Sequence, residues 1–337
     1  MSMTRAARTG VVLGFAAVVP GLFVLLAGKN PWYVLTTLLL YAFGPQGWSE
    51  VLLDAIPLTL IGLGVAFALR GGLFNIGADG QLIAGAVLSV FFAPYFTGWG
   101  LAGLFAFLLL GFAGGAALGA FVGYLRAWFG VSEIIVTIML NYIAVQGVSY
   151  LIRGPLADPS PFYPRSYAIP DDCVLPIIVQ GTRLHAGLFV AIAMTILCAV
   201  VQRQTVFGFQ SSVFGANPAA AAYAGFRVKM LTVVVMAFSG GLGGLAGAVE
   251  VAGVYQRIQE NMAEGFGLSG IAVALIAQLD AVAIPLAACL FGILVAGAGV
   301  LQRELALPFP LLWIVEATVI FTVTALQWAW PRRKAAA

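Results

Sequence analysis

The chain has 337 residues, of which 62% are hydrophobic and only 9% are charged, and its formal net charge is +3. A soluble domain has roughly 25% charged residues, so this composition excludes a soluble protein and indicates an integral membrane protein. The three cysteines lack metal-ligand spacing and there is a single histidine, so neither a disulfide framework nor a metal site is expected.

Ten stretches are predicted to cross the membrane, because about 18 or more apolar residues span a hydrocarbon core of about 30 Å. The first follows Arg5 and Arg8 and resembles a signal peptide, but no small-x-small cleavage site is evident and more apolar sequence follows. The predicted fold is an all-α integral membrane protein, a bundle of about ten transmembrane helices with broken or re-entrant elements. The predicted spans are 9–28, 51–69, 80–97, 100–123, 132–152, 185–202, 230–252, 267–279, 281–300 and 309–329.

The basic residues are distributed unevenly between the two sides of the membrane that these spans define. An even number of spans puts both termini on one side, and a cytoplasmic placement leaves only six of the 16 lysines and arginines outside. This excess of basic residues inside follows the positive-inside rule. The outer six are Lys29, Arg153, Arg165, Arg183, Arg257 and Arg303.

Two connections are much longer than a tight turn and are expected to be contact surfaces. Residues 153–184 form a proline- and aspartate-rich outer loop, and residues 203–229 form a cytoplasmic loop. Residues 29–50 have only about a dozen apolar positions between Pro31 and Gly44, too few to span a bilayer. This segment is predicted to be an outer-face or re-entrant element.

Small residues recur every four positions in two of the spans. This pattern lets helix backbones approach closely, so it predicts a compact bundle without indicating a particular function. The positions are Gly111, Gly115, Gly119, Gly240, Gly244 and Ala248.

A polar, glycine-rich stretch, GGLFNIGADGQ at 71–81, separates two strongly apolar runs. A backbone break inside a bilayer is tolerated only where protein or a water-filled cavity surrounds it. Asn75, Asp79 and Gln81 then offer hydrogen bonds to a polar solute, and intramembrane ionisable residues are functional candidates. The alternative is a short cytoplasmic turn in which Asn75 or Asp79 caps the next helix. A broken helix beside a solute path is the favoured interpretation.

A second interruption, ENMAEGFGLSG at 260–270, is predicted on the opposite side of the membrane. Opposed breaks are typical of transporters built from related halves and point toward the binding site. Glu264 can alternatively be a first-turn residue that the helix dipole favours.

One face of the span at 132–152 carries Glu133, Thr137 and Asn141, which are four residues apart. Such a polar stripe serves either interhelical hydrogen bonding or the lining of a solute pathway. Both interpretations stay open for Thr137 and Asn141. Glu133 lies near the membrane edge, where interhelical bonding is favoured.

The cytoplasmic segment GANPAAAAYAGFR, residues 215–227, is predicted to form a short helix in water. Asn217 can cap it, Pro218 suits its first turn, and Gly225 can end it. A helix of about two turns is only marginal by itself, so it is expected to dock on this chain or on another protein. A capped connector without a partner is the alternative.

Six segments, in order from about residue 55 to 300, carry a resemblance to a known family. The chain resembles the permease subunits of ATP-binding-cassette (ABC) importers of the branched-chain amino acid, ribose and nucleoside superfamily, and is most similar to the nucleoside branch. The segments are GGLFNIGADGQLIAGA, SEIIVTIMLNYIA, GTRLHAGLFVA, VFGANPAAAAYAGFRV, SGGLGGLAGAVEV and GFGLSGIAVALIA.

This resemblance implies a single permease domain over 1–337 that pairs with a second permease and receives nucleosides from an external solute-binding protein. ATP and Mg²⁺ would bind a partner ATPase, while this chain binds no cofactor or nucleic acid and is not an enzyme. It would lie among lipids of the bacterial cytoplasmic (inner) membrane, with both termini cytoplasmic. The residues of the coupling helix on the ATPase would be Gly215, Asn217, Pro218 and Tyr223. The predicted pathway residues, including two aromatic residues able to stack on a base, are Phe74, Asn75, Asp79, Gln81, Thr137, Asn141 and Tyr142.

The chain departs from the family pattern at two places. Asp79 stands where the nucleoside branch more often has glutamate, which is one methylene longer. The turn AQLDAVAIP at 277–285 replaces a glycine, a basic residue and an Asn-Pro pair, so Asp280 puts an acid at this position. These departures bear on the substrate and on one inner contact.

Several alternatives remain open from the sequence. An ABC permease of this kind can import simple sugars instead of nucleosides. An ion-coupled secondary transporter would use carboxylates as ion sites, with Asp54, Asp79, Glu250 and Glu316 as candidates. A channel would not need the docking helix, and no phosphate-binding loop or catalytic triad is evident. His185, next to Arg183, is expected to lie at the membrane interface.

Overall fold

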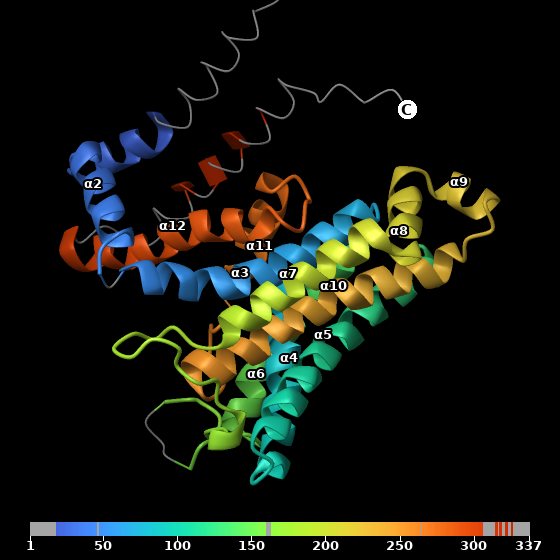
Figure 1. Cartoon of the computed structure of the whole chain (residues 1–337), viewed down its shortest axis with the longest axis horizontal. Coiled ribbons are helices and arrows are strands. Elements are labelled where there is room, and N and C mark those ends of the chain that lie inside the picture. The colour runs from blue at the N-terminus through green and yellow to red at the C-terminus, as the bar shows by residue number, and fades with distance from the viewer. Residues whose placement is uncertain are drawn as a thin grey trace, which may run out of the picture. The chain divides into compact units, whose positions relative to one another are not determined.

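The computed structural model describes residues 18–45, 47–159, 163–263 and 265–305, together with a few positions between 314 and 325. In this part of the chain the regular elements are helices, joined by turns and loops, and there are isolated β-bridges but no strand (Figure 1). The protein is therefore an all-α integral membrane protein, as its composition predicted.

Among the described residues, seven helices are long and apolar enough to cross a membrane, or eight if a bent pair near the N-terminus is one span. They coincide with predicted spans. The span expected at 267–279 is the shorter helix α11 (Phe266–Ile276), and the span expected at 309–329 lies almost wholly outside the described residues. The spanning elements are α3 (Gly47–Arg70), α4 (Ala78–Phe92) with η1 (Ala93–Phe96), α5 (Leu101–Phe129), α6 (Glu133–Arg153), α7 (Gly187–Gln204), α10 (Val228–Glu250) with the π-helical η3 (Val251–Tyr255), and α12 (Ile284–Leu305).

The chain divides into two compact units, which are residues 1–54 with 289–337 and residues 55–288. Helices α3 and α12 contribute residues to both units. The predicted single permease domain over 1–337 stays a prediction. All the residues predicted to form the solute path or the coupling helix lie in the second unit.

In the first unit, the helix Val18–Leu26 and α2 (Pro31–Ala42) are bent by 106° at a short break. Asn30 causes the new start, because its side chain accepts a hydrogen bond from Trp32 N at 2.9 Å and Pro31 follows it. The predicted span at 9–28 is described only from residue 18. The bend fits the re-entrant element expected at 29–50, and it fits a broken span equally well.

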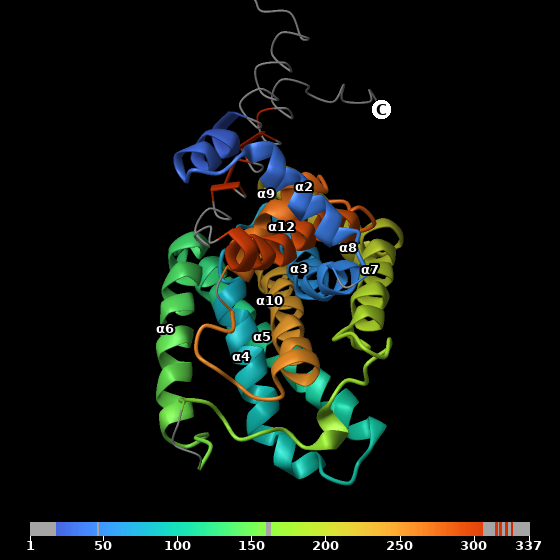
Figure 2. The same ribbon diagram turned by 90° about the vertical axis from the view of Figure 1, so that its left-hand side faces the viewer.

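The second unit is organised around a close contact of α4, α5 and α10, which run together through its centre (Figure 2). A Cβ atom on Gly115 would overlap the carbonyl oxygen of Gly240, and one on Gly85 would overlap the carbonyl oxygen of Gly244. Lipid provides no hydrophobic force between helices, so such backbone contact supplies the packing energy instead. The small-residue pattern of the sequence is thus confirmed as a helix seam.

The long loop between α6 and α7 packs on the segment that follows α10. Ser166 N donates to the Ile258 carbonyl at 2.9 Å, and Ile258 N donates back to the Ser166 hydroxyl at 2.8 Å. Asp158 bridges Arg165 and Arg257, at 2.9 and 3.1 Å. These contacts give the loop a defined conformation at one end of the unit.

Gly115→Ala is expected to destabilise the second unit by about 1–3 kcal/mol, because the added methyl group must push α5 away from α10. Gly147→Ala in α6 is the matched control, since a Cβ atom there meets no other atom within 4 Å. Thermal unfolding of both variants in detergent measures the difference. Equal melting temperatures would contradict the seam.

Candidate functional site

The end of the glycine-rich break at 71–77 lies beside α6, at Ile76 and Gly77. The Asn141 side chain donates to the Ile76 carbonyl at 2.9 Å and accepts from Gly80 N at 2.8 Å. Asn141 is eight residues into α6, about 12 Å from its start, so α4 begins well inside the layer that α6 crosses. This geometry favours an interruption within the membrane over a turn at its surface, because Asn141 supplies the partners that water supplies elsewhere.

Asn75 and Gln81 form a buried amide pair that closes the break. Asn75 Nδ2 donates to Gln81 Oε1 at 2.8 Å, and Gln81 Nε2 donates to Asn75 Oδ1 at 3.0 Å. Asn75 Nδ2 also lies 2.8 Å from the Ser239 hydroxyl of α10, and both amides are 2% exposed. Both amides therefore make most of their hydrogen bonds within the protein.

A second helix begins inside the same unit, next to the start of α4. α11 has 11 residues, about 16 Å, and starts after Gly265, whose φ of +91° a side chain would strain. Gly267 N donates to Asp79 Oδ1 at 2.6 Å, and a Cβ on Gly267 would lie only 2.9 Å from that carboxylate. Asp79 is also in the first turn of α4. One carboxylate thus lies between two helix N-termini, where the helix dipoles favour negative charge.

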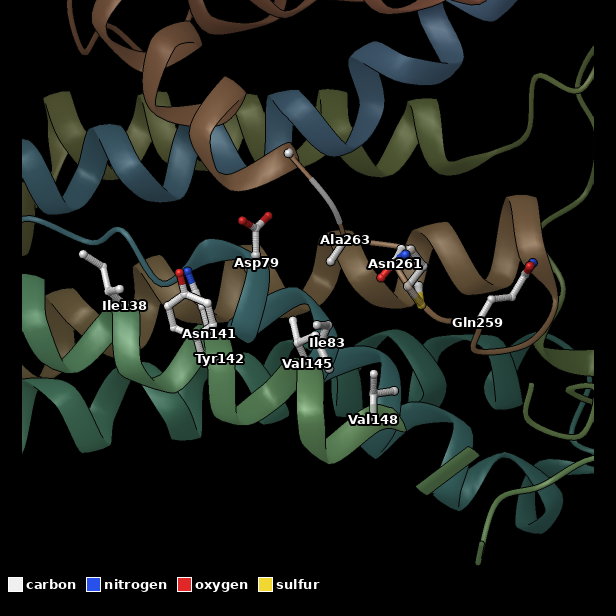
Figure 3. Close-up of a pocket in the computed structure, with 12 residues that line it drawn as sticks. Asp79, Ile83, Ile138, Asn141, Tyr142, Val145, Val148, Gln259, Asn261 and Ala263 are labelled. Carbon is white, nitrogen blue, oxygen red and sulfur yellow. The ribbon is translucent and has the colours of Figure 1, made fainter. Parts of the chain in front are cut away.

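A pocket of about 330 Å³ opens beside this carboxylate. Figure 3 shows α6 along one side and the segment that leads to α11 along the other, with Asp79 and Ile83 contributed by α4. Its volume is at the lower end of the range of small-molecule sites, about 300–1,000 Å³, and it combines apolar walls with a few polar groups as such sites do. The lining residues are Asp79, Ile83, Ile138, Asn141, Tyr142, Val145, Val148, Gln259, Asn261, Met262, Ala263 and Gly265.

Three of the seven predicted pathway residues, Asp79, Asn141 and Tyr142, line this pocket. Thr137 is fully buried and donates to the Glu133 carbonyl of its own helix at 2.8 Å, and Phe74 is 52% exposed. Phe74, Asn75, Gln81 and Thr137 are not among the lining residues. Glu133 pairs with Arg126 at 3.2 Å, as interhelical bonding predicts.

Two polar lining residues, Gln259 and Asn261, were not singled out from the sequence. Asn261 belongs to the second interruption, and its φ of +62° is the left-handed conformation that asparagine tolerates better than most residues. The polar run QRIQEN at 256–261, which follows a predicted span, was the sequence signal that could have indicated these two residues. Glu264 itself lies outside the described residues.

The segment predicted to dock is a separate short helix, as expected. Asn217 accepts hydrogen bonds from Ala219 N and Ala220 N at 3.0 and 3.1 Å, and caps α9 (Pro218–Tyr223). Gly215, at the end of α8 (Val206–Ala216), lies so close to the Arg70 carbonyl that a Cβ would overlap it. Tyr223 is 97% exposed, although tyrosine normally gains from burial.

In the unusual turn at 277–285, the carboxylate of Asp280 is paired with an arginine of α7. Arg203, at the end of α7, contacts both carboxylate oxygens of Asp280 at 2.9 Å. Gln278 and Leu279 precede it with φ of 54° and 62°, conformations that glycine adopts more easily. Asp280 is thereby neutralised within the chain.

The single histidine is buried and lies apart from the pocket. No group of three or more metal-ligating side chains occurs among the described residues. His185 is fully buried just before α7, and its Nδ1 accepts from Gly187 N at 3.1 Å. Burial, with the nearby charge of Arg183, lowers the pKa of His185 to about 4, so this imidazole is neutral at pH 7.

Broken helices that meet at a pocket with a few polar groups inside a membrane bundle are typical of transport proteins. The family described as the permease component of branched-chain amino acid transport systems matches residues 47–322. The chain belongs to this family and is a permease subunit of an ABC importer.

Three relatives show how closely the chain resembles known permeases. The guanosine ABC transporter permease protein NupP of Bacillus subtilis is 37% identical over 82% of this chain and 80% of its own length. The glucose ABC transporter permease protein TsgB13 of Haloferax volcanii is 34% identical, over 83% and 76%. The nucleoside ABC transporter permease protein NupB of Lactococcus lactis is 31% identical, over 93% and 88%. No solved structure matches the chain.

Proposed function

We propose that this permease carries nucleosides into the cell through the pocket beside Asp79. The observation that supports this most is the family match over 47–322, together with two long matches to permeases of guanosine and other nucleosides. The pocket agrees in chemistry, because Asp79, Asn141, Gln259 and Asn261 can bond hydroxyl and base groups while its apolar walls contact a ring.

Simple-sugar import is the second candidate. The relative TsgB13, named as a glucose permease, is 34% identical to this chain. Glucose and the ribose of a nucleoside share neighbouring hydroxyl groups, which a carboxylate and amides can bind in either case. The aromatic ring of Tyr142, 67% exposed at the pocket, favours the nucleoside because a base can stack on it.

The proposed complex contains a second permease, ABC ATPase subunits that bind ATP and Mg²⁺, and an external solute-binding protein. Two organisms each have two permeases with the same named substrate: NupP and NupQ for guanosine in Bacillus subtilis, and NupB and NupC for nucleosides in Lactococcus lactis. This pairing supports a different chain, rather than a second copy, as the partner permease. The excess of basic residues inside supports cytoplasmic termini in a bacterial cytoplasmic membrane.

In this proposal α9 transmits the movement of the ATPase. α9 follows α8, and Gly215 of α8 touches the backbone of Arg70 and Gly72, which open the break. Displacement of α9 would thus reach the start of the segment that shapes the pocket through direct backbone contact. Alternating access then requires the contacts between the broken helices to change, and the Asp79 to Gly267 hydrogen bond is one of these.

Purification of the chain with its native partners, followed by reconstitution into vesicles, tests the function. An ATPase and a second permease are expected to co-purify, and guanosine uptake should require ATP and resist competition by glucose. Uptake of glucose without guanosine would favour the sugar alternative. A chain that purifies alone and transports without ATP would instead support ion coupling.

Asp79→Asn is expected to lower uptake about tenfold or more, because a hydrogen bond to a charged group contributes about 1.5–3 kcal/mol and 1.4 kcal/mol is a factor of ten. Glu304→Gln, also a change from carboxylate to amide, is the control, since Glu304 of α12 is exposed and outside the pocket. Initial uptake rates and the yield of assembled complex are compared. Unchanged rates for Asp79→Asn would remove Asp79 from the transport step.

Tyr223→Ala is expected to weaken binding of the ATPase subunit about 30-fold, because interface tyrosines often contribute about 2 kcal/mol. The side chain is 97% exposed, so folding of the permease itself should not change. Tyr150→Ala in α6, where the side chain is 72% exposed, is the control. Full ATPase binding and coupled hydrolysis in Tyr223→Ala would exclude this residue from the interface.

A further inference from the structure

A second cavity, of about 270 Å³, lies where α5 ends and α10 begins. It shares no lining residue with the solute pocket. It is smaller than the range of about 300–1,000 Å³ that is usual for drug-sized ligands, so it suits a compact group rather than a whole nucleoside. Its lining residues are Gly71, Gly72, Leu73, Arg126, Ala127, Phe214, Gly215, Pro218, Val228, Lys229 and Thr232.

The charge of this cavity is positive. Arg126 and Lys229 are its charged residues, and among the described residues that line it none is acidic. Glu133 occupies one edge of the Arg126 guanidinium, through Nε at 3.2 Å, and the Arg126 side chain stays 44% exposed. Lys229 is exposed, with Nζ 5.6 Å from the centre of the Trp128 ring. Two cations thus border a space that can accept an anion.

The length of α5 places this cavity at the level of the lipid headgroups. Its 29 residues extend for about 43 Å, whereas the hydrocarbon core measures about 30 Å and the bilayer with its polar regions about 40–45 Å. Arg126 belongs to the last turn of α5. Tyr124, Trp128 and Phe129 surround this end with exposed aromatic rings, which is typical of the membrane interface.

We propose that this cavity binds the phosphate of an anionic phospholipid headgroup between Arg126 and Lys229. Basic pockets between membrane helices at the headgroup level are suited to such lipids, because the lipid surface is itself negative. The belt of aromatic residues favours a lipid over an acidic protein segment, since tryptophan and tyrosine are enriched where a membrane protein meets the lipid headgroups.

A bound headgroup would contact the elements that carry the mechanical link in the permease. Gly72 begins the break, and Gly215 and Pro218 flank the cap of α9. The lipid would brace these segments against α5 and α10, so anionic lipid is expected to stabilise the inner end of the unit and to raise transport. This inference depends on the chain being a membrane protein and not on the identity of the solute.

Lys229→Gln is the principal test, because Lys229 can be replaced without leaving a buried acid unpaired. Arg126→Gln combined with Glu133→Gln removes the second cation together with its partner. Arg303→Gln is the control, since Arg303 is exposed, belongs to the last turn of α12 and does not line the cavity. The purified full complex is placed in phosphatidylcholine bilayers with and without phosphatidylglycerol, and retained lipid is counted by native mass spectrometry.

Lys229→Gln and the double variant are expected to retain phosphatidylglycerol about fivefold more weakly, since one basic residue near an anionic surface contributes about 1 kcal/mol. Arg303→Gln should retain phosphatidylglycerol like the wild type. Phosphatidylglycerol should raise the melting temperature and the uptake of the wild type and of this control, and not of the other two variants. Equal retention by all variants would overturn the proposal. The same stabilisation by inorganic phosphate in phosphatidylcholine would show a free-phosphate site instead. Loss of the ATPase subunit from Lys229→Gln, with lipid retention unchanged, would show that this residue contacts a protein. Either of these last two results would reject the proposed lipid site.

Discussion

A polypeptide backbone that is interrupted inside a membrane must find its hydrogen-bond partners within the protein, and this constraint governs the arrangement around α4. The Asn141 amide binds the Ile76 carbonyl and the Gly80 N–H, and the Asn75 and Gln81 amides close the rest of the break on each other. These bonds hold the start of α4 in mid-membrane. The pocket exists because the helix begins there and not at the surface.

The glycine seam and the break have complementary mechanical roles. Backbone contact along α4, α5 and α10 leaves no space for a relative shift of these helices, so they form the rigid part of the second unit. α11 and the segment before it are joined to that rigid part by hydrogen bonds, including the one from Gly267 to Asp79. Hydrogen bonds can exchange partners during a transport cycle, whereas interlocked backbones cannot slide past one another without clashing.

Charged groups in this chain are placed where a definite partner compensates them. Asp79 lies between two helix N-termini, Asp280 binds Arg203, and Asp158 binds two arginines. At the proposed lipid site the compensating charge would come from outside the chain, since Arg126 and Lys229 border a cavity whose described lining carries no acid.

Local composition, spacing and capping chemistry were enough to predict the membrane class, the position of most spans, the seam through Gly115 and Gly240, and the Asn217 cap of α9. The polar groups that face the pocket could not be predicted in this way. Asn75 and Gln81 look as suited to a solute as Asp79 does, yet they bind each other, and Gln259 and Asn261 reach the pocket from a distant segment. A side chain's partner depends on which helices meet, and sequence spacing within one helix carries no such information.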